Sequence, residues 1–462
     1  MNNINHQNNI YIKDLLTLYC FNHIYVSTKN KEAKGVQLTF IIILTLFSIF
    51  LIINSKKVKT ESDFTLAGRG LNTSKVSFVI IGTLVGGAST VGTVQLAYTY
   101  GVAAWIFTLF SGIACLILGL FFAKALRLEE VTTVSEFIGN KLGKRFQTYT
   151  SFFSSFGMYI HIVAQFLAAM SIIETIFTSN KTISLPVTFI LILIFVISGG
   201  VMASSSIGKI KVYLLYGLMI ISAYIAITKQ NGILNLIHSI PDKRMLSLFS
   251  YGTFKASKDM FAMVIGVLST QTYLQAIFSA KDVKTARNGA FLSAALIPPI
   301  GIFGIIVGIY MRIHHPELSN NTTVIFPYFI KLYFNPFVAA IFMASLTVII
   351  LGTAAGLTLG VTTNIYIDIL KNSKINKLKI GEMLKLKITA LIVLLTSSLI
   401  VITGLDSKIL DWSYMSMGIR GSAIFIPMLL IMAIKDKKTL KRLKPFIAAL
   451  PIIYIITSLI LK

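Results

Sequence analysis

Arg420 is the residue of this sequence whose type and position point most directly to ligand binding. It lies near the middle of the apolar run 409–434, in the segment SYMSMGIRGSAIF, with Gly418 and Gly421 on either side. An arginine at the centre of a bilayer costs about 2.5–3.5 kcal/mol on insertion scales, so it must face a cavity or a partner. Its planar fork of N–H donors can bind a carboxylate, whereas a structural arginine would pair with backbone carbonyls. Asp411 lies nine positions earlier, about 13 Å along a helix, which is too far for easy pairing.

Glycine and hydroxyl residues interrupt two apolar runs in a way that suits cation binding. The run 76–98 contains four glycines together with Ser89 and Thr90, and the run 337–370 contains the segment LGTAAGLTLGVTTN. A glycine weakens a helix by up to about 1 kcal/mol relative to alanine. Unwound backbone is tolerated within a membrane only where it lines a cavity, and there its free carbonyls can hold a cation. The alternative is close packing of small residues between helices.

Polar side chains within several of the apolar runs could hydrogen-bond a solute. For Gln95, an amide bond between helices is an equal alternative. His161 and Gln165 lie four positions apart on one face of a helix, where the histidine could relay a proton, although a packing role is favoured. The candidate solute-binding residues are Gln95, Ser89, Thr90, Gln271, Tyr414, Ser416 and Arg420.

Membrane-spanning helices must position these residues. The chain has 462 residues, with 55% hydrophobic residues, 13% charged residues and a mean hydropathy of +0.79. Soluble domains carry about 25% charged residues, so the composition excludes a soluble enzyme, a disordered chain and a fibrous repeat. Apolar runs long enough to cross a bilayer form helices. The predicted fold is an all-α polytopic membrane protein with about twelve transmembrane helices, in the runs 36–55, 76–98, 102–126, 146–176, 183–203, 212–227, 260–280, 290–313, 337–370, 388–403, 409–434 and 445–461.

The distribution of basic residues predicts how the chain is oriented. The formal net charge is +25, and 27 of the 42 Lys and Arg residues fall in alternate loops, among them Lys209 and Lys211. By the positive-inside rule these loops are cytoplasmic and both termini are external, in the plasma membrane. The polar residues 1–35 are then an external tail. The basic excess reports topology and contact with anionic lipids of the bilayer, and no nucleic-acid partner is expected.

No arrangement typical of an enzyme accompanies these residues. The sequence contains no Ser/His/Asp set, no paired histidine–carboxylate metal site and no Walker-type phosphate loop. We therefore expect neither catalysis nor an organic cofactor or transition metal.

The chain resembles the sodium:solute symporter family in five segments that occur in order between residues 62 and 370. Each segment is weak alone, and together they are specific. The segments are SDFTLAGRGL (62–71), GGASTVGTVQLAYTYG (86–101), LRLEEVTTVSEFIG (126–139) with the later pair Gly199 and Gly200, QAIFSAKDVKTARNG (275–289) and TTNIYIDIL, which ends the run 337–370.

The resemblance implies a fold and a function. The fold would be a LeuT-like core of two inverted five-helix repeats, 76–227 and 260–434, with one helix before it (36–55) and one after it (445–461). The leading helix of each repeat would be broken, and the second contains Gly266 beside Ser269 and Thr270. The implied function is secondary active transport, in which a sodium-coupled symporter imports a small polar solute, such as a carboxylate or an amino acid, by alternating access.

The resemblance also implies a sodium site between the broken helix of the first repeat and the run 337–370. Its ligands would be the carbonyls of Ala88, Val91 and Ile349 and the side chain of Thr353, which suits a hard cation with oxygen ligands.

Three positions depart from the family pattern. Gly352 stands where a hydroxyl is usual, Gly208 stands where an acidic residue is usual, and Thr90 stands where one branch has an acid. A proton-coupled or uncoupled transporter therefore remains an alternative to sodium coupling. A membrane sensor is the least favoured reading, because the chain stops directly after its last apolar run.

Overall fold

The computed structural model describes residues 34–50, 53, 66–129, 131–197, 201–371, 381–402, 408–434 and 436–460. This part of the chain is helical, apart from one isolated bridge between Leu71 and Ala280. Eight of its helices are long and apolar enough to cross a membrane, and three shorter apolar helices accompany them. The predicted all-α membrane fold is confirmed. Most of the tail 1–35, the start of the segment 62–71 and the pair Gly199 and Gly200 lie outside the described residues.

Every predicted apolar run corresponds to a described helix or pair of helices. These are the helix Lys34–Phe50, α3 (Thr73–Leu84) with α4 (Thr93–Tyr100), α5 (Trp105–Ile117) with α6 (Ala123–Leu128), α8 (Lys144–Phe177), α9 (Lys181–Ile197), α10 (Val201–Lys229), α12 (Thr253–Val267) with α13 (Gln271–Phe278), α14 (Val283–Leu296) with α15 (Pro298–His314), α17 (Pro336–Asn364), α18 (Glu382–Ile402), α19 (Ile409–Ala433) and α20 (Lys437–Ile460).

Shorter elements connect or interrupt these helices. They are η1 (Ala67–Arg69), η2 (Ala88–Gly92), η3 (Gly101–Ala104), η4 (Leu118–Phe122), α7 (Val134–Leu142), α11 (Ile233–His238), η5 (Lys243–Leu246), η6 (Pro316–Asn320), η7 (Thr322–Val324), α16 (Ile325–Tyr333) and η8 (Ile365–Leu370).

The first interruption lies between α3 and α4, where the glycine pattern predicts it. The helix α3 ends at Leu84, the next residue Val85 is extended (φ −89°, ψ 105°), and the π-helical turn η2 follows before α4 begins. Gly86 approaches its neighbours closely, because a Cβ there would lie 2.4 Å from Thr353 Oγ1 and 2.7 Å from Gln165 Oε1. Only glycine allows the unwound segment to pack against α8 and α17 at this distance.

A second interruption separates α12 from α13 at residues 268–270. The hydroxyls of Ser269 and Thr270 donate to the carbonyls of Ile265 (2.6 Å) and Gly266 (2.7 Å) and so close the end of α12. Side-chain hydroxyls of this kind compete with the backbone for the carbonyls of the last helical turn. The predicted break in this helix is confirmed.

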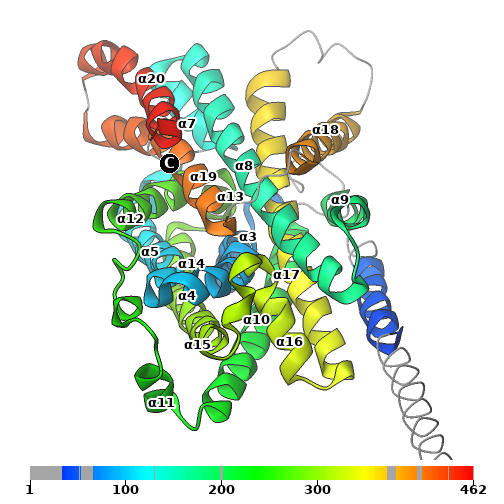
Figure 1. Cartoon of the computed structure of the whole chain (residues 1–462). Helices are drawn as coiled ribbons and strands as arrows, with labels where there is room; N and C mark the ends of the chain where they lie inside the picture. The colour runs from blue at the N-terminus through cyan, green and yellow to red at the C-terminus, as the bar shows by residue number, and fades with distance from the viewer. Residues whose placement is uncertain are drawn as a thin grey trace, which may run out of the picture.

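The two interrupted helices lie in the interior of the molecule. Figure 1 shows α3 and α13 near the middle of the view, while α18 and α20 lie at the periphery. The long helix α8 packs along both α17 and α19, and α3 packs against α10 and α14. Large apolar side chains such as Phe121 and Phe446 face outward, as expected for a surface in contact with lipid.

Candidate ion and solute site

An oxygen cluster forms where the end of α3 meets the middle of α17. The buried hydroxyl Oγ1 of Thr353 lies 3.0 Å from the carbonyl oxygen of Val85 and 3.3 Å from those of Gly82 and Ile349. A hydroxyl has a single hydrogen to donate, so it cannot satisfy three carbonyls at once. The cluster therefore presents an excess of lone pairs to any cation that enters it.

The interruption of α3 explains why these carbonyls are available. The last carbonyls of a helix have no partner within the helix. Gly82 lies in the last turn of α3 and Val85 follows it directly. Extension of the chain at Val85 leaves both carbonyls directed at α17 instead of at the next turn of their own helix.

The structure brings together two of the four predicted sodium ligands. Ile349 and Thr353 lie in the cluster, whereas Ala88 and Val91 lie beyond the interruption, in η2. The carbonyl of Ala88 accepts a hydrogen bond from Thr93 Oγ1 at 3.2 Å. The carbonyls of Gly82 and Val85, which the sequence did not single out, also lie in the cluster. The adjacent glycines 86 and 87 are the sequence signal for these two carbonyls, because a helix that ends at a glycine pair exposes the carbonyls just before the pair.

Ser89 and Thr90 use their hydroxyls within the interrupted segment. Ser89 Oγ donates to the carbonyl of Leu84 (3.4 Å) and Thr90 Oγ1 donates to that of Gly86 (2.8 Å). From α8, the Oε1 atom of Gln165 accepts the N–H of Gly87 at 2.8 Å. These hydrogen bonds shape the unwound segment.

Lys211 reaches the same oxygen cluster from α10. Its Nζ donates to the carbonyl of Gly82 and, at 2.7 Å, to Thr353 Oγ1. The side chain is buried, with 2% of its surface exposed, whereas Lys209 on the same helix is exposed. The pattern of basic residues predicts Lys211 in a cytoplasmic loop, and this prediction is wrong because Lys211 lies within α10, which begins at Val201. Residue type and hydropathy assign a lysine to a loop, and only the packing of α10 on α3 and α17 shows it is internal.

Arg420 is fully buried beside the second interruption. Its NH1 donates to Thr270 Oγ1 (2.8 Å), and its NH2 donates to Ser416 Oγ (2.9 Å) and contacts Nδ1 of His161 at 3.2 Å. Within the described part of the chain the guanidinium forms no ion pair. Asp411, which the helix spacing placed too far away, pairs with Lys255 at 3.5 Å.

Ser416 and Tyr414 differ in their relation to Arg420. Ser416 Oγ accepts from Arg420 and donates to the carbonyl of Gly157 on α8 (2.5 Å). The ring of Tyr414 packs against Phe107 at 5.9 Å, and its hydroxyl has no hydrogen-bond partner among the described residues. Such a buried, unpaired hydroxyl is available to a bound polar molecule.

Gln95 and Gln271 each connect an interrupted helix to elements that are distant in the chain. Gln95 Nε2 donates to Thr322 Oγ1 of η7 (3.0 Å), and Gln95 Oε1 accepts the N–H of Ile409 at the start of α19 (3.1 Å). Gln271 Nε2 donates to the carbonyl of Thr132 and Gln271 Oε1 accepts the N–H of Val134, both at 3.0 Å. Both glutamines therefore hydrogen-bond within the protein, and neither contacts Arg420 in the described structure.

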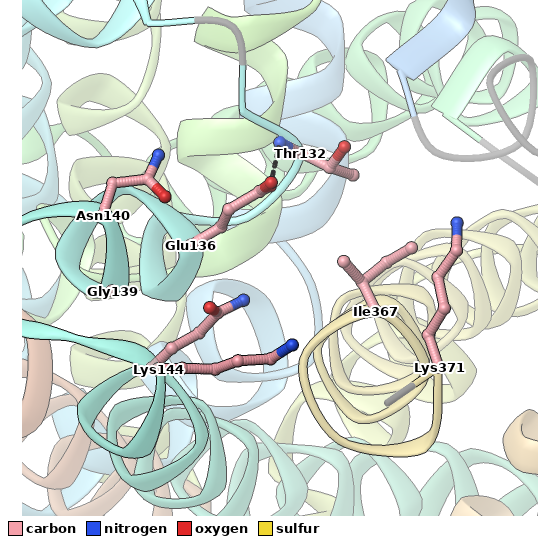
Figure 2. Close-up of a pocket in the computed structure, with 8 residues that line it drawn as sticks. Thr132, Glu136, Gly139, Asn140, Lys144, Ile367 and Lys371 are labelled. Carbon is pink, nitrogen blue, oxygen red and sulfur yellow. Dashed lines mark hydrogen bonds between the residues drawn. The ribbon is translucent and has the colours of Figure 1, made fainter. Parts of the chain in front are cut away.

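A cavity of about 470 Å³ lies between α7, the start of α8 and η8. Figure 2 shows Glu136, Lys144 and Lys371 around it, so its wall carries both signs of charge. Next to it, the carboxylate of Asp368 accepts from Thr133 Oγ1 (2.9 Å) and Gln147 Nε2 (2.7 Å). These contacts join two of the family-like segments at the ends of α7 and η8.

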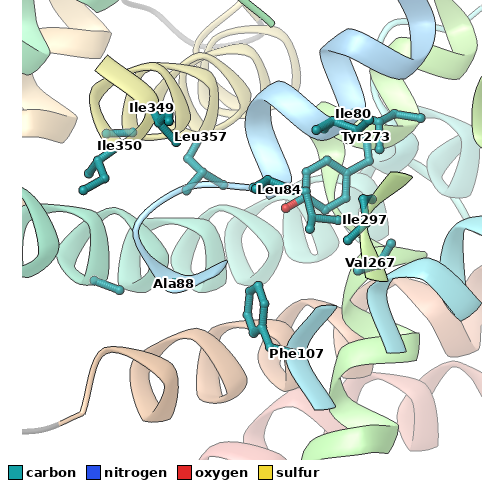
Figure 3. Packing of buried hydrophobic residues seen from close by; sticks show 14 of the residues in the cluster. Ile80, Leu84, Ala88, Phe107, Val267, Tyr273, Ile297, Ile349, Ile350 and Leu357 are labelled. Atoms are coloured by element: carbon teal, nitrogen blue, oxygen red, sulfur yellow. The ribbon is translucent and has the colours of Figure 1, made fainter. Parts of the chain in front are cut away.

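Apolar side chains fill the space between the two interrupted helices. Figure 3 shows Ala88, Phe107 and Tyr273 around the unwound segment after Leu84, together with Val267 from the end of α12. The arrangement combines an oxygen cluster, a buried guanidinium and an apolar centre. The oxygen cluster between α3 and α17 can hold a cation, and the guanidinium beside the second interruption can bind a polar solute, as in membrane transporters with discontinuous helices.

Comparisons with known proteins show the family and the fold of the chain. A family model described as the sodium:solute symporter family matches residues 64–439. The uncharacterized symporter YwcA of Bacillus subtilis is 24% identical over 280 residues, which cover 57% of this chain and 53% of that protein. The chain therefore spans about half the length of this curated relative.

Two solved structures share the fold. A Na+-coupled sialic acid symporter in a substrate-bound, outward-open state superposes with a TM-score of 0.71 at 16% identity, with 86% of each chain covered. Mhp1, a nucleobase-cation-symport-1 family transporter in a closed conformation, superposes with a TM-score of 0.59 at 12% identity, with 84% and 85% covered. The chain thus has the fold that these two membrane transporters share. Within this class, the chain belongs to the sodium:solute symporter family.

Proposed function

We propose that the protein is a secondary active transporter that imports a small polar solute through the plasma membrane together with sodium. The oxygen cluster between the end of α3 and α17 carries this proposal, because it joins the two proposed repeats, 76–227 and 260–434. Membership of the sodium:solute symporter family supports the coupling ion. The basic loops support the orientation, with both termini external.

Sodium would bind to the carbonyls of Gly82, Val85 and Ile349 and to the hydroxyl of Thr353. A hard cation takes oxygen ligands of this kind. The three carbonyl oxygens each lie within 3.3 Å of Thr353 Oγ1. A cation there favours the state in which α3 and α17 are together, so its binding energy can shift the balance between the states of the transport cycle.

A carboxylate is the solute class that the site favours. Arg420 brings a full positive charge into the interior and finds only neutral groups around it in the described structure. A buried charge without an opposite charge is costly, and a bound carboxylate would supply that charge. Because Arg420 contacts Thr270, a carboxylate bound to Arg420 would lie beside the second interruption, between α12 and α13. This interruption is the counterpart of the interruption between α3 and α4 at the oxygen cluster.

The test is thermal unfolding of the detergent-purified protein with a panel of carboxylates, amino acids and sugars, each in sodium and in choline buffer. A ligand that binds the folded protein raises its unfolding temperature by mass action. We expect a carboxylate or amino acid to stabilise the protein, more strongly in sodium. Stabilisation by neutral sugars alone would refute the role of Arg420.

A proton-coupled or uncoupled transporter of the same fold is the second candidate. The observation that favours it is the ammonium group of Lys211 within the oxygen cluster. Uptake into proteoliposomes with and without a sodium gradient separates the two candidates, because an uncoupled transporter gives equal initial rates.

A further inference from the structure

The ammonium of Lys211 occupies two contacts that the proposed function assigns to sodium. It donates to the carbonyl of Gly82 and to the hydroxyl of Thr353. An ammonium group and a sodium ion carry the same charge and seek the same oxygen atoms. They cannot share these contacts, because two cations at this separation repel strongly inside a protein.

Within the described part of the chain, the ammonium of Lys211 forms no ion pair that would explain its burial. α17 contains no titratable side chain, and α3 contains only Lys75, which is exposed at its other end. The titratable residues of α15 lie at its far end, where His314 contacts Gln230, about 28 Å from Lys211 along α10. Within α10, which contains no Asp or Glu, Tyr216 donates instead to the carbonyl of Leu296. The oxygen cluster is therefore what holds the charge of Lys211.

We propose that Lys211 is a tethered cation that occupies the coupling site. In the state described here its ammonium joins the end of α3 to α17, as a bound ion would, and sodium enters only when this side chain withdraws. The inference rests on the proposed function, because the cluster is the sodium site assigned there. The strength of sodium binding is then set by a residue that is not itself a sodium ligand.

Two consequences follow from this competition. Removal of the ammonium frees the cluster, so sodium binds more tightly. Removal of the ammonium also breaks the link between α3 and α17, so the variant is less stable than the wild type in the absence of sodium. Added sodium should restore this link and the lost stability. A lysine that only packed against the cluster would show the loss of stability without the restoration by sodium.

The experiment uses the full chain purified in sodium chloride and exchanged into choline chloride at constant ionic strength. The variants are Lys211→Met, which keeps the length of the side chain, and Lys211→Gln, which keeps a polar end without the charge. Lys209→Met is the matched control, because this lysine lies on the same helix and is exposed. The unfolding temperature is measured as choline is replaced by sodium, and again with the solute identified in the panel.

We expect the half-saturating sodium concentration of both Lys211 variants to be at least about tenfold lower than that of the wild type. Their unfolding temperature should be lower than that of the wild type in choline and should recover in sodium. The Lys209→Met variant should match the wild type in both measurements. If sodium stabilises the Lys211 variants but not the wild type, the tethered cation is supported and sodium coupling in the native protein is refuted.

Other outcomes separate the two claims. If sodium stabilises the wild type and both Lys211 variants at the same concentration, the tethered cation is refuted and the sodium site stands. If sodium stabilises none of them while the solute still does, both the sodium site and the tethered cation are refuted, and solute binding stands. If the solute stabilises no variant while the sodium response changes as expected, the tethered cation stands and the proposed solute class fails.

Discussion

The hydroxyl of Thr353 lies at the centre of the oxygen cluster that forms the proposed cation site. It faces the carbonyls of Gly82, Val85 and Ile349 but can donate to one of them at a time. The remaining lone pairs attract a positive charge, whether it comes from an ion or from the ammonium of Lys211. Replacement of this single oxygen should therefore weaken cation binding without changing the shape of the side chain.

The first prediction concerns Thr353→Val, which removes the hydroxyl and keeps the branched shape. We expect it to raise the half-saturating sodium concentration about tenfold, equivalent to about 1.4 kcal/mol for one lost oxygen ligand. The measurement is sodium-dependent thermal stabilisation in a Lys211→Gln background, so that the lysine's own contact with Thr353 does not contribute.

Thr358→Val is the matched control for this prediction. Thr358 is buried in the same helix, and its hydroxyl donates only to the carbonyl of Ala354 (2.8 Å) in the previous turn. Its replacement should leave the sodium response unchanged. An equal loss in both variants would mean that α17 has been disturbed in general, and would refute the assignment of Thr353.

The second prediction concerns Arg420→Lys. Lysine keeps the charge but loses the planar fork that can hold a carboxylate and also reach Thr270 and Ser416. We expect the affinity for a carboxylate solute to fall at least about tenfold, while the unfolding temperature changes less than the affinity does. Solute titration by thermal shift gives both quantities. Unchanged affinity would show that Arg420 is a structural residue.

At the scale of the elements, the interruption of α3 depends on glycines that no other residue can replace. A Cβ on Gly86 would lie 2.4 Å from Thr353 Oγ1, and one on Gly87 would lie 2.4 Å from the Cβ of Ala168 on α8. The unwound segment therefore fits between α8 and α17 only because these two positions lack side chains. The oxygen cluster exists as a consequence of this fit.

The third prediction concerns Gly86→Ala. The added methyl group must push the segment away from α17, so we expect loss of the sodium response and a destabilisation of about 1–3 kcal/mol. Gly217→Ala is the control, because a Cβ at this helical glycine of α10 meets nothing within 4 Å. It should be neutral or stabilise the protein by up to about 1 kcal/mol. Retained sodium binding in Gly86→Ala would show that the cluster tolerates movement of α3.

At the scale of the whole molecule, we expect Gln95 and Gln271 to hold opposite ends of the interior closed. Gln95 connects α4 to η7 and α19, and Gln271 connects α13 to the segment before α7. In alternating access the two ends open in turn. In the proposed transport cycle, we therefore expect each pair of hydrogen bonds to break in one half of the cycle and to re-form in the other.

The fourth prediction concerns Gln271→Leu. Loss of two hydrogen bonds, worth about 1 kcal/mol each, should favour the state open at the end near α7. A cysteine at the buried position Ser135 of α7 should then react with a maleimide at least about tenfold faster. The measurement is the labelling rate of Ser135→Cys in a variant without Cys20 and Cys115.

Gln95→Leu is the control, because it releases the opposite end. Labelling of Ser135→Cys should not accelerate in this background. Equal acceleration in both variants would indicate local loosening of the fold and would refute the separate roles of the two glutamines.

The sequence alone determined the class and the helices of this protein. Long apolar runs must form helices in lipid because no other local structure satisfies their backbone groups there. Glycine clusters and hydroxyls marked both interruptions because their effect on a helix is local. For the same reason the sequence could single out Arg420, whose charge is unusual in an apolar run, whereas Thr353 was indicated only by the resemblance to the family.

Only the tertiary structure decided which groups meet. The carbonyls of Gly82 and Val85 carry no side-chain signal, since every residue has the same backbone oxygen, and their availability depends on where α3 ends. From its sequence Lys211 was predicted to lie in a loop. The packing of α10 against α3 and α17 instead places its ammonium beside those oxygens. Hydropathy and local pattern describe one segment at a time, whereas a cation site is built by several segments distant in the chain.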